Sequence, residues 1–141
     1  MEIYIASSWK NQHAVEMLTD ALRDMGHDVR SFVENNYGEG HKPVDFEEWV
    51  QTDKAEGSFN YDTDGATECD LVIYLGPSGT DAWAEIGAAW ASDRVIYGLW
   101  AKSEPAGLMR KMVSQWFTNY RNLLSAIDRL EEKQDGVNPS S

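Results

Sequence analysis

One glutamate occupies the stretch of the chain that is most suggestive of chemistry. Residues 70–90 read DLVIYLGPSGTDAWAEIGAAW, in which Glu85 has small and apolar neighbours and Asp81 precedes it by four residues. That spacing puts both carboxylates on one face of a helix. The pattern is a strand, a loop and a helix start, the kind of junction where α/β proteins bind ligands. Glu85 is therefore either a catalytic carboxylate or a solvated helix residue.

Glycosyl transfer is one reaction that a pair of carboxylates can carry out. It needs a carboxylate nucleophile near the anomeric carbon and a second group that hydrogen-bonds or protonates the leaving base. Glu85 fits the first role, and Asp62 or Asp81 fits the second. A retaining mechanism requires carboxyl groups about 5 Å apart, and spacing along the chain does not determine that distance.

The turn before this helix offers further polar groups. Ser78, Gly79 and Thr80 supply backbone N–H groups and hydroxyls at the expected helix N-terminus, which can hold an anion or fix a carboxylate. The turn is not a P-loop, because no lysine follows at the required position.

Strand-like and helix-like segments alternate along the chain, which predicts an α/β fold with a mainly parallel sheet. We expect strands at 1–7, 27–34, 71–76, 95–100 and 115–117. The predicted architecture is a flavodoxin-like, Rossmann-like three-layer sandwich with strand order 2-1-3-4-5. Its switch point lies between the first and third strands, so the polar turn with Ser7, Ser8 and Trp9 should face the turn after Gly76.

The expected helices follow apolar periodicity and capping signals. The first should run to Met25 and bury Ala14, Leu18, Ala21, Leu22 and Met25. Asp62 is the expected N-cap of a short helix over 62–69, after a loop at 55–61. The other helices are expected at 44–54, 81–92, within 102–113, and at 119–133. We expect a polar loop at 35–43, which includes His41. We expect residues 1–134 to form one domain and residues 135–141 to form a flexible tail.

Composition narrows the function classes. The net charge of −12 argues against a broad surface for nucleic acid. No apolar run is long enough for a membrane helix, and the N-terminus lacks the pattern of a signal peptide. The single Cys69 excludes an internal disulfide framework and a multi-cysteine metal site, so a cytoplasmic protein is expected.

Three separated segments resemble the nucleoside 2-deoxyribosyltransferase family, over most of residues 1–113. IYIASSW is similar to the family's first strand and its ligand-side turn, with Tyr4 at the position of the active-site tyrosine. DLVIYLGPSGTDAWAEIGAAWA is similar to its strand–loop–helix segment, with Glu85 at the position of the nucleophile. Asp62 lies eight residues before Asp70, which is similar to the spacing of the aspartate that precedes the family's third strand.

The resemblance implies a mechanism and a set of partners. Glu85 would attack C1′ of a deoxynucleoside, Asp62 would hydrogen-bond and protonate the base, and Tyr4 would orient Glu85. The covalent intermediate would pass to another base or to water. The resemblance implies substrate contacts from Ser7, Ser8, Trp9, Ser78, Gly79, Thr80 and Asp81. It also implies no metal, no cofactor, and a homo-oligomer, a dimer or higher.

Some positions depart from the family pattern. Gly79 stands where the family often has aspartate, and Asp81 is the candidate replacement. Gly107 stands near the position of an asparagine that reaches a neighbouring subunit's ligand. The related deoxynucleoside 5′-monophosphate N-hydrolases have a glycine-rich first loop for phosphate. Here that loop is SSWKN, which leaves Ser7, Ser8 and Lys10 as candidates.

Two other classes of function remain open from the sequence. One is a TIR-like domain that cleaves NAD or a related nucleotide, which shares the sheet order and a catalytic glutamate. The other is a non-catalytic nucleotide-binding protein, in which the tryptophans serve the core or subunit contacts. Base preference, sugar type, 5′-phosphorylation and the choice between transfer and hydrolysis are not determined by the sequence.

Overall fold

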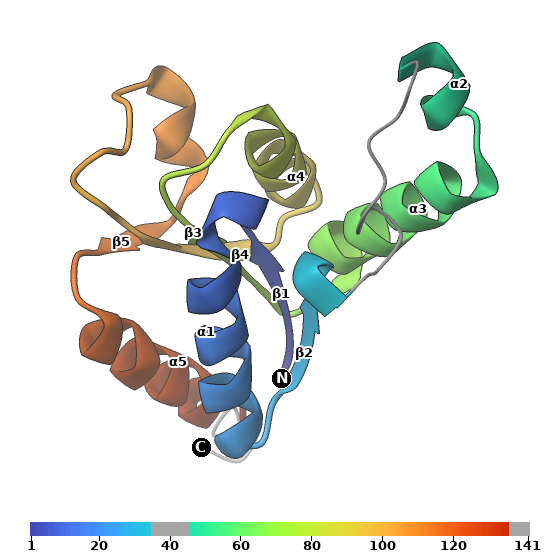
Figure 1. The fold of residues 1–141 in the computed structure, drawn as a ribbon. Helices are drawn as coiled ribbons and strands as arrows, with labels where there is room; N and C mark the ends of the chain where they lie inside the picture. Colours follow the sequence, from blue (N-terminus) through green and yellow to red (C-terminus); the bar gives the residue numbers. More distant parts are fainter. Residues whose placement is uncertain (35–45, 136–141) are drawn as a thin grey trace.

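A computed structural model describes residues 1–34 and 46–135 of the chain. Its centre is a five-stranded sheet with the order β2-β1-β3-β4-β5, shown in Figure 1. All four strand pairs are parallel. The predicted α/β class and the strand order 2-1-3-4-5 are therefore confirmed.

The strands begin and end close to the predicted positions. They are β1 (Glu2–Ala6), β2 (Asp28–Ser31), β3 (Leu71–Leu75), β4 (Val95–Leu99) and β5 (Gln115–Phe117). Both β1 and β3 are almost fully buried, as expected for central parallel strands that helices cover on both faces.

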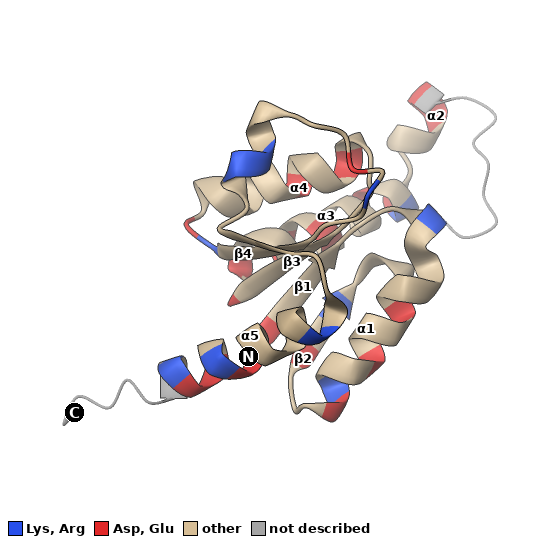
Figure 2. Cartoon of the chain, turned by 90° about the vertical axis from the view of Figure 1, so that its left-hand side faces the viewer, with Lys and Arg blue, Asp and Glu red and all other residues tan. Residues whose placement is uncertain are grey.

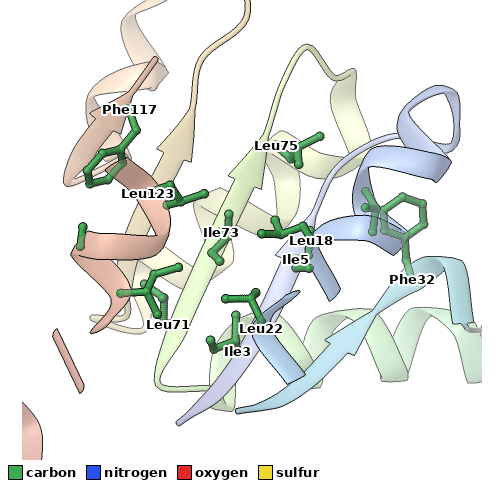
Figure 3. Packing of buried hydrophobic residues seen from close by; sticks show 13 residues of the cluster. Ile3, Ile5, Leu18, Leu22, Phe32, Leu71, Ile73, Leu75, Phe117 and Leu123 are labelled. Carbon is green, nitrogen blue, oxygen red and sulfur yellow. The ribbon is translucent and has the colours of Figure 1, made fainter. Parts of the chain in front are cut away.

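The side-chain alternation along these strands creates two cores. Ile3 and Ile5 of β1 pack with α1 (Gln12–Asp24) and α5 (Tyr120–Asp135), and Figure 3 shows this layer. Tyr4 and Ala6 point to the opposite face, toward α3 (Asp53–Glu68) and α4 (Thr80–Ala91). Figure 2 shows the two helix layers on either side of the sheet. The face that carries Tyr4 is thus the face that carries Glu85.

The region before β3 differs from the prediction. One continuous helix, α3, replaces the expected loop at 55–61 and short helix at 62–69, and its N-cap is Thr52 instead of Asp62. The sequence shows no helical apolar stripe here because α3 buries only Ala55, Gly65 and Ala66. Of the expected helix at 44–54, the described residues form α2 (Phe46–Val50) and the first two residues of α3. The α2 helix lies at the far end of α3 in Figure 1.

Three further expectations need correction. The second strand ends at Ser31, and a 3₁₀ helix, η2 (Phe32–Glu34), follows it. The expected helix within 102–113 is only a 3₁₀ helix, η4 (Leu108–Met112). In α1 the buried positions are Val15, Leu18, Thr19 and Leu22, while Ala14 is exposed. Leu18 and Leu22 are thus buried as predicted and Met25 packs against the core, whereas Val15 and Thr19 are buried in place of Ala14.

Some expectations fall outside the described residues. They concern the loop at 35–43 with His41 and the tail, except for Asp135, which ends α5. Among the residues that the structure describes, no helix is long and apolar enough to cross a membrane.

Candidate active site

A pocket of about 350 Å³ opens at the carboxyl ends of β1 and β3. This is the switch point of the strand order, where open parallel sheets bind ligands. The pocket includes the residues that the sequence nominated for catalysis or substrate binding, except Tyr4, which contacts Glu85 from β1, and the phosphate candidate Lys10. Its wall consists of Ser7, Ser8, Trp9, Phe32, Asp62, Ser78, Gly79, Thr80, Asp81, Ala82 and Glu85.

The tyrosine and the glutamate form the centre of the site. The Tyr4 hydroxyl donates a hydrogen bond of 2.7 Å to Oε2 of Glu85. Tyr4 is fully buried on β1, and Glu85 lies on the second turn of α4. Burial raises the pKa of Tyr4 far above its usual range, and the charges of Glu85 and Asp62 raise it further. The hydroxyl therefore stays protonated and holds one carboxylate oxygen in place.

Asp62 reaches the same centre from α3. It lines the pocket and interacts with both Tyr4 and Glu85. Gly65, one turn later, explains how α3 comes this close to β1. A Cβ atom at Gly65 would collide with the Tyr4 ring and lie 2.9 Å from Cδ of Arg30. Gly65 is therefore a site of close helix–strand contact, which only a residue without a Cβ atom permits.

The electrostatics of the site favour a protonated Glu85 near neutral pH. Burial is the largest cause and raises the pKa of Glu85 to about 8. The hydrogen bond from Tyr4 opposes this shift, while the negative charges of Asp62 and Asp81 add to it. A strongly perturbed carboxyl group in a cleft is a physical indicator of a functional site.

The loop before α4 forms a second wall of the pocket. Gly79 is the N-cap of α4 and makes no side-chain cap, while Thr80 and Asp81 are exposed in the first turn. The Ser78 hydroxyl is buried and has no hydrogen-bond partner among the described residues.

The turn after β1, which contains Ser7, Ser8 and Trp9, provides another wall of the pocket. Ser7 is buried and its Oγ donates a 2.6 Å hydrogen bond to the carbonyl oxygen of Leu75. Ser8 accepts a hydrogen bond from the backbone N–H of Lys10. The Trp9 ring is 43% exposed and meets the Phe32 ring edge-on, with centroids 5.3 Å apart. The two rings offer an aromatic surface beside the carboxylates.

Sequence reasoning missed two pocket residues. Phe32 looked like an ordinary core residue of the second strand, but the strand ends before it and η2 turns it toward Trp9. Ala82 is one of the small residues around Glu85, which can leave room for a ligand or permit close helix–sheet packing, and it was not singled out as a contact. Neither position carries a signal in the sequence that distinguishes pocket from core.

The described part of the chain has no cluster of side chains suited to a metal ion. Within residues 1–34 and 46–135, no three His, Cys, Asp or Glu side chains are grouped so as to hold a metal ion. Cys69 is a free thiol that is buried in the layer beneath α3 and α4, and burial raises its pKa to about 11.

The chain is similar in structure to two enzymes that act on N-glycosidic bonds. A 2-deoxyribosyltransferase from Bacillus psychrosaccharolyticus superposes with a TM-score of 0.69 and 20% identity, covering 87% of this chain and 90% of that one. The CMP N-glycosidase of Clostridium botulinum gives a TM-score of 0.59 and 19% identity, over 91% of this chain and 99% of that one.

A third similar structure is a conserved protein from Enterococcus faecalis. It has a TM-score of 0.65 and 15% identity, and the match covers 92% of this chain and 98% of that one. No protein-family model matches the chain, and no curated protein matches it either. At these identities the likeness establishes the fold: the chain has the architecture of the 2-deoxyribosyltransferases along nearly its whole length.

Proposed function

We propose that this protein cleaves or transfers the N-glycosidic bond of a nucleoside or nucleotide, with Glu85 as the nucleophile. The observation that carries the proposal is the hydrogen bond from buried Tyr4 to Glu85, at the floor of a pocket that Asp62 also lines. The fold shared with a 2-deoxyribosyltransferase and a CMP N-glycosidase supports the same class of reaction.

The proposed reaction has two displacement steps. In the first, a Glu85 oxygen bonds to C1′ while the bond from C1′ to the base nitrogen breaks. The two carboxyl groups share one proton, which resides on Asp62 in the reactive form; Asp62 hydrogen-bonds the base and gives it this proton as it leaves. In the second, another base or water attacks C1′, gives its proton to Asp62, and releases the Glu85 carboxylate. Tyr4 holds the nonbonded carboxylate oxygen throughout, which fixes the direction of attack.

The substrate contacts are assigned by their place in the wall. Trp9, which lines the pocket and packs against Phe32, would contact the base. Ser8 and the loop from Ser78 to Asp81 would contact the sugar. The reaction as proposed uses protein side chains alone.

The proposal also includes a homo-oligomer and a cytoplasmic location. Sedimentation velocity would reveal the homo-oligomer.

The first experiment identifies the reaction. The protein is incubated with deoxyinosine and free adenine, and separately with deoxynucleoside 5′-monophosphates and with NAD. Deoxyadenosine indicates transfer, and free deoxyribose or its phosphate indicates hydrolysis. Loss of NAD alone would instead favour the TIR-like alternative. Absence of any reaction, with a ligand still raising the melting temperature, would favour a binding protein.

The second experiment identifies the nucleophile. A 2′-fluoro nucleoside should leave a covalent adduct on Glu85 that mass spectrometry detects, because fluorine slows the second step. Glu85→Gln should form no adduct and lose about a thousandfold or more of kcat. Glu132→Gln, at an exposed position on α5, is the matched control and should behave as the wild type. An adduct on another residue would contradict the assignment.

A further inference from the structure

The two loops that border the pocket are joined by a residue that is not in its wall. Asn11 Nδ2 donates one hydrogen bond of 3.0 Å to Ser7 Oγ and another of 2.8 Å to the carbonyl oxygen of Pro77. Ser7 Oγ in turn donates its hydrogen to the carbonyl oxygen of Leu75, at 2.6 Å. The bond from Asn11 to Pro77 therefore joins the segment after β1 to the loop after β3, the bond from Ser7 reaches the last residue of β3, and the bond from Asn11 to Ser7 links these two contacts.

The Asn11 side chain does not make the hydrogen bond that is usual at its position in the helix. Asn11 is the N-cap residue of α1, where asparagine normally accepts a hydrogen bond from a backbone N–H of its own helix. Here its side chain makes no such cap. The carbonyl oxygen of Pro77 can only accept, so the amide nitrogen must face it. The side chain therefore does not cap α1, and its two donor hydrogens go to Ser7 Oγ and to the carbonyl oxygen of Pro77.

The connection bears on the geometry of the pocket. Pro77 directly precedes the Ser78–Asp81 wall, and Ser7 directly precedes the wall formed by Ser8 and Trp9. Because Ser7 commits its hydroxyl hydrogen to Leu75, it cannot offer that hydrogen to a ligand. The distance between the two walls therefore depends on Asn11 and Ser7, while the chemistry depends on groups that they do not touch.

We propose that Asn11, acting through Ser7 and Pro77, is a positioning residue that sets the separation of the two substrate-binding loops. The inference rests on the proposed function insofar as the ligand is a nucleoside or nucleotide. It assigns Ser7 a bracing role instead of a direct substrate contact.

Asn11→Asp is the diagnostic variant. Aspartate has the same shape and is a good N-cap, but it lacks both donor hydrogens. The matched control is Asn119→Ala, which removes an N-cap at α5, where Asn119 Oδ1 accepts from the N–H groups of Arg121 (2.8 Å) and Asn122 (3.2 Å). Asn119 does not line the pocket.

Steady-state kinetics provide the first measurement. With whichever substrate the wild type turns over, Asn11→Asp should raise KM by about tenfold and lower kcat by less, since misplaced binding loops weaken substrate positioning. The pH midpoint assigned to Glu85 should stay unchanged. Asn119→Ala should keep the wild-type KM. An unaltered KM in Asn11→Asp, or an equal rise in both variants, overturns the proposal.

Hydrogen exchange provides a measurement that does not require turnover. The backbone amides of Gly76, Ser78, Gly79 and Thr80, which flank Pro77, should exchange faster in Asn11→Asp than in the wild type or in Asn119→Ala. Unchanged exchange at 76–80 overturns the inference whether or not the protein is an enzyme. If the wild type turns over no substrate, the proposed function fails, whereas faster exchange at 76–80 still supports the bracing of the two loops.

Discussion

The reactivity proposed for Glu85 depends on three neighbours with opposing effects. Burial and the negative charges of Asp62 and Asp81 favour the protonated carboxyl group, whereas the hydrogen bond from Tyr4 favours the carboxylate. A nucleophilic glutamate must be ionised, so the balance among these groups sets the pH above which the first step can proceed.

Substitution of the neighbours should therefore move the titration of Glu85 in opposite directions. In the wild type the carboxyl group should titrate near pH 8. Tyr4→Phe removes the hydrogen bond that stabilises the anion, so the pKa of Glu85 should rise. Asp62→Asn removes a nearby negative charge, so that pKa should fall. NMR of protein with ¹³C-labelled glutamate carboxyl groups measures both shifts without relying on activity.

Two controls secure the assignment. Glu85→Gln should remove the perturbed resonance and identify it. Asp20→Asn, on the exposed side of α1, should leave the midpoint unchanged. Shifts of the same sign in Tyr4→Phe and Asp62→Asn would contradict these opposing effects, and no shift in either variant would show that burial alone governs the pKa of Glu85.

At the scale of secondary-structure elements, the site depends on how closely α3 approaches β1. Asp62 is on α3 and Tyr4 is on β1, and the contact between the two elements is made where Gly65 lies over the tyrosine ring. The same glycine lies in the last turn of α3, where it is a weaker helix former than alanine. Its presence there is explained by packing and not by helix propensity.

Gly65→Ala should destabilise the fold because the added methyl group must displace the Tyr4 ring or α3. We expect a loss of about 1 to 3 kcal/mol in the free energy of unfolding, measured by urea denaturation. Gly87→Ala on α4 is the matched control, since a Cβ there has no neighbour within 4 Å. That variant should be as stable as the wild type or more stable by up to about 1 kcal/mol. A Gly65→Ala protein of wild-type stability would refute the tight contact.

At the scale of the whole molecule, negative charge dominates. The chain has 24 acidic and 12 basic residues and a net charge of −12. Figure 2 shows acidic residues on the helices of both layers. Such an excess keeps a protein dispersed but opposes compaction through self-repulsion.

Moderate salt should consequently stabilise the protein. Raising NaCl from about 10 mM to about 150 mM shortens the Debye length from about 30 Å to about 8 Å, which screens the repulsion. The melting temperature in differential scanning fluorimetry should increase by a few degrees. Sucrose of equal osmolality controls for solute effects on hydration. A melting temperature that falls with salt would mean that attractive ion pairs, such as Arg23–Glu34 and Arg110–Glu104, outweigh the repulsion.

The sequence by itself determined the sheet and the central pair of the site. Continuous apolar runs such as LVIYL specify buried parallel strands, and alternating helices specify their order, because few topologies satisfy both. The strand ends then place the turns after Ala6 and Gly76 at one edge. The motif resemblance singled out Tyr4, Asp62 and Glu85, and two of these three side chains are directly hydrogen-bonded.

Only the tertiary structure decided how the remaining elements take part. The α3 helix has no apolar stripe, so its continuity depends on contacts at Ala55, Gly65 and Ala66 that no local pattern reveals. Phe32 enters the pocket wall because β2 stops one residue before it. Asn11 reads as a helix cap, and its bonds to Ser7 and Pro77 exist because β1 and β3 are neighbours in the sheet. Each of these features rests on contacts between segments far apart in the chain, which residue spacing does not encode.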